Sequence, residues 1–222
     1  MNALNHAAFI MDGDGRWGKK RGKGRNFGHL KGFETVRRIV KTSIKLKIPI
    51  ITFYVFSTEN WKRPLNEKKY LFKLIVNYFS KELESLISQG IKINILGDTK
   101  KFSKDLKITL KKTVELTKKN KKIIVNLALN YGSKIEIIQA FKKTGKKFSI
   151  KKFENNLYTK NMPNPDILIR TGGYKRLSNF LLWQLAYTEL FFFKKLWPDF
   201  KSIDLIKTVK KFNSIKRNYG NI

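Results

Sequence analysis

The sequence contains no cysteine among its 222 residues, so disulfide bonds and cysteine-ligated zinc sites are excluded. It also lacks a long hydrophobic run, since the most apolar stretch, 180–193, is interrupted by polar residues and is too short to span a bilayer. No basic segment followed by an apolar run opens the chain, so no signal peptide is predicted. We therefore expect a cytoplasmic protein whose contact with membrane lipid, if it makes any, is peripheral.

Several catalytic motifs are absent as well. The sequence has no GxxxxGK[ST] phosphate-binding loop, no HExxH metalloprotease motif and no GxSxG nucleophile motif. These absences argue against a P-loop nucleotide hydrolase, a zinc protease of the HExxH type and an α/β-hydrolase.

Acidic residues are scarce: 16 Asp and Glu stand against 48 Lys and Arg, which gives a formal net charge of +32. Such a charge commonly indicates a nucleic-acid-binding protein. Here, however, the lysines are spread along the whole chain and do not form one arm or stripe, and Lys, Asn, Ile and Phe, which have A/T-rich codons, are all abundant. We interpret the charge as compositional and expect no nucleic-acid partner, while a basic nucleic-acid-binding module stays the competing class.

The hydrophobic content of 41% is high enough for one domain, 1–222, with a substantial core. Apolar periodicity predicts strands that alternate with helices. The predicted strands are 6–11, 50–56, 91–96, 123–128 and 166–169, and the predicted helices are 28–46, 66–89, 104–118, 134–143 and 202–216. This alternation predicts a single-domain α/β fold with a mostly parallel central sheet flanked by helices.

Polar or glycine-containing segments follow directly after four of the predicted strands. They are DGDGR at 12–16, STEN at 57–60, NYG at 130–132 and RTGG at 170–173. Ligands of parallel α/β sheets bind at the carboxyl ends of the strands. We therefore expect these four loops to converge on one site.

The first loop can bind an anion together with a cation. Its glycines let backbone N–H groups approach a phosphate, Asp12 can hold a divalent cation, and Arg16 and Arg25 can grip phosphate oxygens. The alternative is a tight turn with solvated acids. The loop is not an EF-hand, because the remaining ligand positions are missing.

The segment 170–178 offers a second phosphate site, with two arginines and a hydroxyl, Ser178, around a glycine turn. The alternative is a solvated basic loop. Arg170 argues for a site, since it ends a buried strand, where an unpaired charge would be costly. Three other candidates can also be explained as purely structural features. They are the polar turn that precedes Pro64, the helix residue His29 and the lone acid Glu189.

With these residues in view, the chain resembles the cis-prenyltransferases, among them bacterial undecaprenyl diphosphate synthases. The matching segments follow the family order over nearly the whole chain: HAAFIMDGDGRW, GHLKG, FYVFSTENWKRP, ILGD, LNYG, ILIRTGG, RLSNFLLWQLAYTEL and LWPDF. No two aspartates are adjacent, so the aspartate-rich motif of trans-type prenyl synthases is missing.

The resemblance implies a Mg²⁺-dependent enzyme. It would condense isopentenyl diphosphate sequentially onto farnesyl diphosphate with cis double bonds, giving a polyprenyl diphosphate, the undecaprenyl carrier precursor for cell-wall synthesis. It further implies a homodimer, and a hydrophobic tunnel between two helices and the sheet. A non-catalytic partner subunit of the family is the third possibility, but Asp12, Arg16, Arg170 and Arg176 are all present.

The resemblance also assigns roles to residues. Asp12 is implied as the catalytic carboxylate and Mg²⁺ ligand, Glu189 as a second Mg²⁺ ligand, and Asn60 as the residue at the proton-acceptor position. Because a neutral amide is a poor base, we expect Asn60 to orient the reactants. The implied substrate-binding residues are Gly13, Asp14, Gly15, Arg16, Trp17, Arg25 and His29 for the allylic diphosphate; Ser57, Thr58, Glu59, Trp61 and Arg63 at the reacting end; and Arg170, Arg176, Leu177 and Ser178 for isopentenyl diphosphate.

The chain departs from the family pattern at several positions. Asp14 replaces the usual Asn, and an acid there would repel a diphosphate unless it is protonated or a metal lies nearby. Tyr174 and Lys175 replace an acid–His pair. In the tail, Ile215 and Asn218 stand where many relatives carry arginines, leaving Arg217. Finally, the bulk of Val55 could limit product length if this side chain points into the tunnel.

Overall fold

The computed structural model describes residues 2–146 and 148–217. Its centre is a six-stranded sheet in the order β3-β4-β2-β1-β5-β6, in which every neighbouring pair is parallel. The strands are β1 (His6–Ile10), β2 (Ile50–Ser57), β3 (Ile91–Leu96), β4 (Ile123–Tyr131), β5 (Ile167–Arg170) and β6 (Glu189–Phe192). The prediction of a single-domain α/β fold with a mostly parallel sheet is confirmed.

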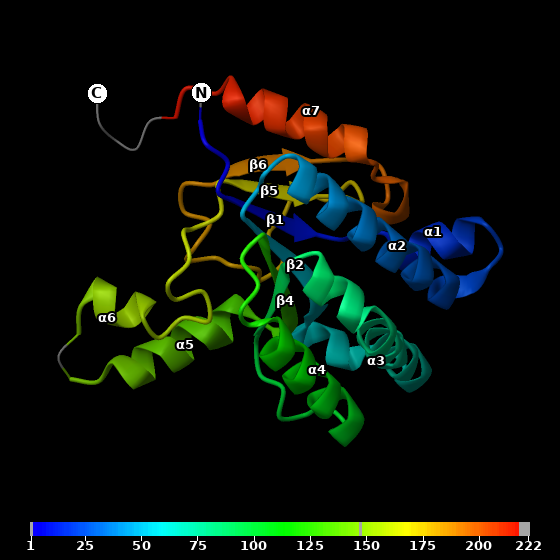
Figure 1. The fold of residues 1–222 in the computed structure, drawn as a ribbon, viewed down its shortest axis with the longest axis horizontal. Coiled ribbons are helices and arrows are strands. Elements are labelled where there is room, and N and C mark those ends of the chain that lie inside the picture. Colours follow the sequence, from blue (N-terminus) through cyan, green and yellow to red (C-terminus); the bar gives the residue numbers. More distant parts are fainter. Residues whose placement is uncertain (1, 147, 218–222) are drawn as a thin grey trace.

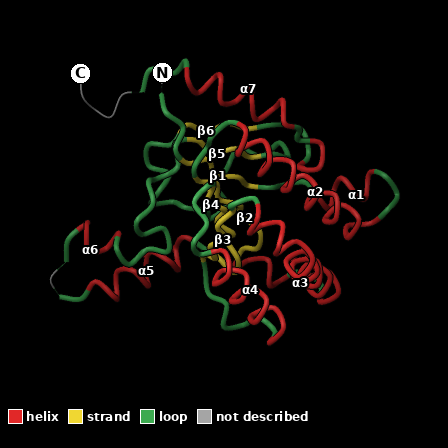
Figure 2. The backbone as a smooth tube through the Cα atoms, in the orientation of Figure 1, coloured by secondary structure: helices red, strands yellow, loops and turns green. Residues whose placement is uncertain are grey.

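Helices cover both faces of this sheet. They are α1 (Asp14–Lys20), α2 (Gly24–Lys45), α3 (Leu65–Ser88), α4 (Lys104–Thr117), α5 (Ser133–Thr144), α6 (Ile150–Glu154) and α7 (Ser202–Asn213), with 3₁₀ turns at Thr58–Lys62 and Trp197–Asp199. In Figures 1 and 2, α2, α3, α4 and α7 lie on one side of the sheet, and α5 and α6 lie together on the other. No helix in the described ranges is both long enough and apolar enough to cross a bilayer.

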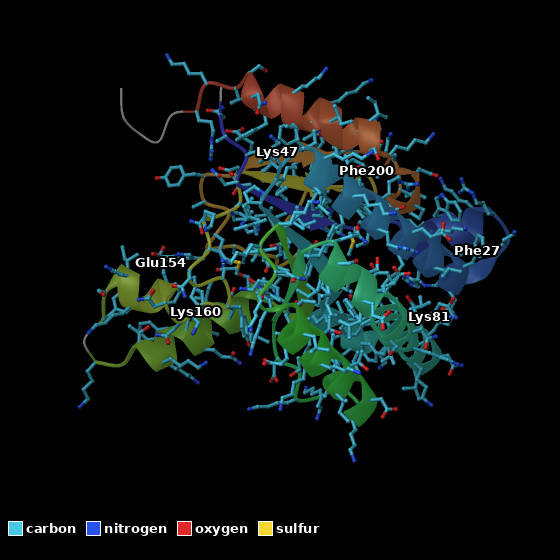
Figure 3. The ribbon with its side chains drawn as sticks, viewed as in Figure 1. Phe27, Lys47, Lys81, Glu154, Lys160 and Phe200 are labelled. Carbon is cyan, nitrogen blue, oxygen red and sulfur yellow. The ribbon has the colours of Figure 1, made fainter. Side chains whose placement is uncertain are left out.

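Side-chain alternation along the strands divides the core in two. Phe9 of β1 and Phe53 of β2 are fully buried in the cluster formed with α2, α3, α4 and α7. Ala8 of β1 belongs to the cluster on the opposite face, with Phe180 and Leu181. Because both faces are buried, the strands are nearly continuous apolar runs. Side chains fill the space between the layers in Figure 3.

Some predicted boundaries were wrong. The loop predicted at 12–16 already contains the first turns of α1, and α2 begins at Gly24, not at residue 28. Strand β6 and the short helix α6 were not predicted. β6 lies within an aromatic block whose alternation is weak, and it becomes a strand by pairing with β5.

Candidate active site

A cavity of about 880 Å³, the main cavity below, opens where β1, β2 and β5 end. One part of its lining is polar and charged. The other part is apolar and comes from α2, α3, β2 and β4: Phe33, Val36, Val55, Leu71, Ile75, Tyr78, Phe79, Leu127 and Leu129. Three of the four predicted loops, 12–16, 57–60 and 170–173, contribute to the polar part, so their predicted convergence is confirmed.

The fourth loop, NYG, does not line the cavity. Asn130 instead accepts a hydrogen bond from Trp61 Nε1 at 2.7 Å and donates one to the Asp98 carbonyl at 2.7 Å. Its role is to hold the neighbouring loop in place.

Gly13 allows the sharp turn from β1 into α1. Its φ is +123°, a conformation that side chains strongly disfavour, and a Cβ there would lie 2.8–3.0 Å from Leu196. The carbonyl of Gly13 accepts the first helical hydrogen bond, from Trp17, at 2.8 Å. Asp12, directly before this turn, is thereby directed to the mouth of the cavity.

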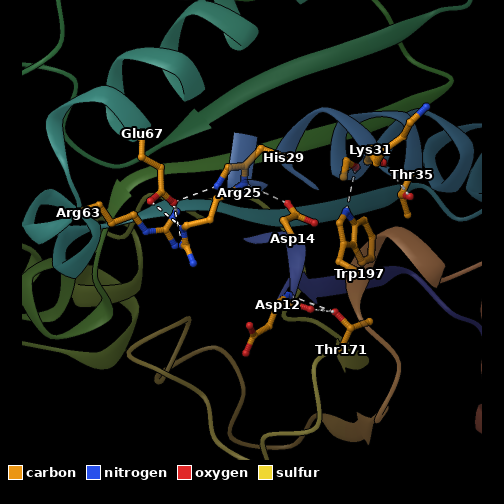
Figure 4. A network of polar contacts seen from close by, with 11 residues as sticks. Asp12, Asp14, Arg25, His29, Lys31, Thr35, Arg63, Glu67, Thr171 and Trp197 are labelled. Carbon is orange, nitrogen blue, oxygen red and sulfur yellow. Dashed lines mark hydrogen bonds and ion pairs between the residues drawn. The ribbon is translucent and has the colours of Figure 1, made fainter. Parts of the chain in front are cut away.

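The Asp12 carboxylate is held between two arginines. Arg16 Nη2 donates to Oδ1 at 3.1 Å, and Arg170 Nη2 donates to Oδ2 at 3.0 Å. Thr171 fixes the backbone of Asp12 by two hydrogen bonds, of 2.8 and 3.1 Å (Figure 4). The side chain of Arg170 is only 3% exposed, whereas that of Asp12 is 27% exposed and faces the cavity.

A second carboxylate, Glu67 in the first turn of α3, contacts two arginines and a histidine. Arg25 binds it through two hydrogen bonds of 2.9 Å, His29 Nε2 lies 3.0 Å away, and Arg63 lies at 3.5 Å (Figure 4). Burial opposes ionisation, but the hydrogen bonds and charges of these partners lower the pKa of Glu67 to about 2. Sequence reasoning missed Glu67, which is 7% exposed and lies outside the cavity lining.

Asp14 faces α2. Its Oδ2 lies 3.5 Å from His29 Nδ1, and a Cβ at Gly32 would come within 2.4 Å of the carboxyl group. Burial raises the pKa of Asp14 to about 6, against the opposing effects of His29 and Arg63. The carboxyl group is therefore mostly ionised at pH 7, and only below about pH 6 does its protonation reduce the repulsion of an anion.

The other cationic group lies in the loop after β5. Arg170 Nη1 donates to Ser178 Oγ at 2.7 Å and to the carbonyl of Arg176. The Tyr174 ring lies 4.5–5.9 Å from the guanidinium carbons of Arg16, Arg170 and Arg176. One exposed aromatic ring thus contacts all three arginines at the mouth.

Asn60 closes a capping box at the end of β2. Its Oδ1 accepts a hydrogen bond from the Ser57 backbone N–H at 3.2 Å, and both residues line the cavity. Glu59 beside them accepts a hydrogen bond from Asn179 at 2.9 Å. The amide oxygen of Asn60 is therefore engaged locally, which suits an orienting role better than proton abstraction.

Most of the predicted site residues are brought together. Those that line the main cavity are Asp12, Gly13, Asp14, Gly15, Arg16, Arg25, His29, Ser57, Glu59, Asn60, Arg63, Arg170, Arg176, Leu177 and Ser178. Trp17, Thr58, Trp61 and Glu189 do not line it. Lys134 and Asn179, which were not predicted, do. Trp17 is instead tied to Asp199 by a 2.7 Å hydrogen bond.

Asp12 is suited to bind a magnesium ion. Asp12 and Glu189 of the same chain, however, cannot bind one ion together. Mg²⁺ is commonly bound by one or two carboxylates together with substrate phosphates and water, and Asp12 offers such a carboxylate at the cavity. Glu189 begins β6 opposite Ile167, at the amino end of the parallel strands, whereas Asp12 follows a carboxyl end. Within residues 2–146 and 148–217, no three His, Asp or Glu side chains are grouped to hold a metal.

The tail does not reach the site within the described residues. Arg217 donates hydrogen bonds of 2.9 Å to Asp166 and to the Tyr187 carbonyl, beyond the amino end of β5. Asn218 lies outside the described residues.

A parallel α/β sheet that ends at a cationic, carboxylate-bearing mouth, with an apolar cavity behind it, defines a protein that can bind an anionic group joined to a hydrocarbon. The family model described as "Putative undecaprenyl diphosphate synthase" matches residues 10–220. The chain belongs to this family, the isoprenyl transferases.

Relatives in sequence and structure agree with this. The isoprenyl transferase of Oceanobacillus iheyensis is 42% identical, with 100% of this chain and 92% of the relative aligned. That of Clostridium tetani is 43% identical, covering 100% and 91%. The crystal structure of lavandulyl diphosphate synthase from Lavandula x intermedia, in complex with dimethylallyl diphosphate, superposes with a TM-score of 0.94 at 30% identity over 98% of each chain. A probable undecaprenyl diphosphate synthase from Campylobacter jejuni gives 0.85 at 29% identity over 100% of each.

Proposed function

We propose that this isoprenyl transferase condenses isopentenyl diphosphate repeatedly onto farnesyl diphosphate, with cis double bonds. The product would be a long polyprenyl diphosphate, the undecaprenyl carrier precursor for cell-wall synthesis. The observation that carries the proposal is the continuity of the main cavity, which joins the Asp12 mouth to an apolar interior. Such a cavity suits a substrate with one charged end and one hydrocarbon end.

The first half of the reaction breaks the bond between the allylic carbon and its diphosphate. Negative charge then develops on the leaving diphosphate, close to Arg16, Arg25 and the backbone of the α1 N-terminus. Asp12 would hold Mg²⁺, which when bound supplies further charge neutralisation on the diphosphate oxygens. Arg16 and Arg170 keep the Asp12 carboxylate oriented until then.

The second half forms a carbon–carbon bond from the double bond of isopentenyl diphosphate to the allylic carbon, with loss of one proton. Arg170, Arg176 and Ser178, which all line the main cavity, would bind the diphosphate of this second substrate. Asn60 orients the reactants, and a phosphate oxygen or a water molecule takes the proton. Burial of each added CH₂ group in the cavity contributes about 0.8 kcal/mol of favourable free energy, which favours elongation into the cavity.

We propose that the protein works as a homodimer in the cytoplasm, with peripheral contact to membrane lipid. Helices α5 and α6 expose Ile138, Phe141 and Ile150, and the edge strand β6 exposes Leu190, which are apolar positions that a second copy could cover. Glu189 can serve as a second magnesium ligand only if another copy brings it to Asp12. Light scattering after size exclusion tests this: the wild type should have twice the chain mass and a Phe141→Glu variant should be shifted toward monomer, whereas a monomeric wild type would contradict it.

The proposed activity is tested with purified protein, farnesyl diphosphate, radiolabelled isopentenyl diphosphate and Mg²⁺. We expect a ladder of labelled polyprenyl products that ends at one long chain, and none after addition of EDTA. Absence of product with Mg²⁺ and detergent present would refute the proposed function.

A further inference from the structure

We propose that Tyr78 on α3 is the side chain that limits product length in this enzyme, because it separates the main cavity from a second cavity behind it. The inference rests on the proposed chain elongation and adds to it a particular residue and a direction of change.

The second cavity, called the distal cavity below, has a volume of about 80 Å³ and lies between α2, α3 and the sheet. Four residues line both cavities: Val36 of α2, Tyr78 and Phe79 of α3, and Leu127 of β4. These side chains therefore form the partition between the two spaces. Val55, the candidate from the sequence, lines the main cavity only.

Within the partition, Tyr78 spans the gap between the two helices. Its ring centroid lies 5.9 Å from that of Phe33 on α2 and 5.2 Å from that of Phe79 in an edge-to-face arrangement. Phe79 is 4% exposed and belongs to the core, whereas Tyr78 is only partly buried and packs against that core. Removing the Tyr78 ring therefore opens the partition with less disturbance of the core than removing Phe79.

The distal cavity has the lining expected for the end of a hydrocarbon tunnel. Ile91, Ile93 and Val125 form an apolar floor, and polar side chains close the outer side, where Arg37 Nη2 and Glu82 Oε2 form an ion pair of 3.2 Å between α2 and α3. Apolar cavities of about 150 Å³ hold one benzene molecule. At about 80 Å³ the distal cavity is too small for another five-carbon unit, unless the Tyr78 ring is removed.

The test compares Tyr78→Ala and Tyr78→Val with the wild type in the farnesyl diphosphate and labelled isopentenyl diphosphate assay, with products resolved by length. We expect the longest major product of both variants to gain at least one five-carbon unit. Tyr70→Ala is the matched control, since Tyr70 lies on the same helix but lines neither cavity. It should keep the wild-type distribution.

Thermal melting of each variant shows whether it is folded, and Tyr78→Val keeps part of the packing in case Tyr78→Ala does not fold. Unchanged product length in a folded, active Tyr78 variant overturns the inference while leaving the proposed function intact. An equal lengthening in Tyr70→Ala also overturns it, because the effect would then be a general loosening of α3. A wild type that incorporates no label refutes the proposed function, and the Tyr78 inference with it.

Discussion

Two carboxylates in this molecule are each surrounded by cations, yet they differ in what they can do. Asp12 binds Arg16 and Arg170 and is 27% exposed to the main cavity. Glu67 binds Arg25, and its exposed fraction is 7%. Asp12 lies in the cavity lining, where a ligand can reach it, whereas Glu67 lies outside that lining.

The comparison indicates how the site stays ordered before substrate arrives. Glu67 fixes Arg25 and His29 by contacts between α3 and α2, and Arg63 by a contact within the same segment of chain, so these side chains are held at the mouth without a bound anion. In the proposed function, Asp12 is the carboxylate that would bind the metal ion. We expect substitutions of Asp12 to affect turnover most, and substitutions of Glu67 to affect stability most.

Replacing Asp12 with Asn should have the largest effect. The amide keeps the shape but binds Mg²⁺ poorly, so we expect the rate of the first condensation to fall by about 100-fold or more. The free energy of unfolding should fall by less than about 2 kcal/mol, because the buried Arg170 keeps its hydrogen bonds to Ser178 and to the carbonyl of Arg176. Single-turnover kinetics and urea denaturation measure the two effects, and a variant with near-normal turnover would remove Asp12 from the chemistry.

Replacing Glu67 with Gln should affect the free energy of unfolding more than turnover. It leaves Arg25, His29 and Arg63 without their common anion, and we expect a loss of roughly 2–4 kcal/mol of unfolding free energy at pH 7. The pKa of Glu67 is lowered in the folded state, so its contribution is present above the unfolded pKa near 4.5 and is lost as the pH falls toward 2. Denaturation curves of wild type and variant should therefore converge over that range; a constant difference would contradict the role given to Glu67.

Replacing Asp14 with Asn should have the smallest effect of the three substitutions. It should raise the free energy of unfolding, whereas the other two should lower it. Burial raises the pKa of Asp14 to about 6, so its contribution to stability is fully present below the unfolded pKa of 3.8 and is lost as the pH rises through 6. At pH 7.5 the variant should be more stable than the wild type by about 1–2 kcal/mol. This advantage should shrink below pH 5, and thermal melts at the two pH values check it. A variant that is less stable at both would show that the Asp14–His29 contact outweighs burial.

Much of this site could be predicted from the sequence, because the residues that carry it sit in short segments directly after strands. Asp12, Arg16 and Arg170 are predicted from that position together with their charge, since parallel strands share one carboxyl edge. Glu67 could not be found in this way. It is an ordinary acid in the first turn of a helix, and its importance comes from contacts with residues about 40 positions earlier.

The remaining errors have similar physical causes. Trp17 and Trp61 belong to matching segments, but each has its indole N–H bound to a polar side chain and packs as a support behind the mouth. β6 is a strand through its pairing with β5, which local alternation does not reveal. The limit at Tyr78 depends on the spacing of two helices, which no local pattern encodes.

The central claim, that Asp12 is where a metal ion and a leaving diphosphate meet, is tested most directly without turnover. Inorganic pyrophosphate binding would be measured by calorimetry with and without Mg²⁺, for the wild type and Asp12→Asn. The account predicts that Mg²⁺ strengthens binding to the wild type by about tenfold or more and has little effect on the variant. Equal strengthening of both proteins by Mg²⁺, or of neither, would contradict it.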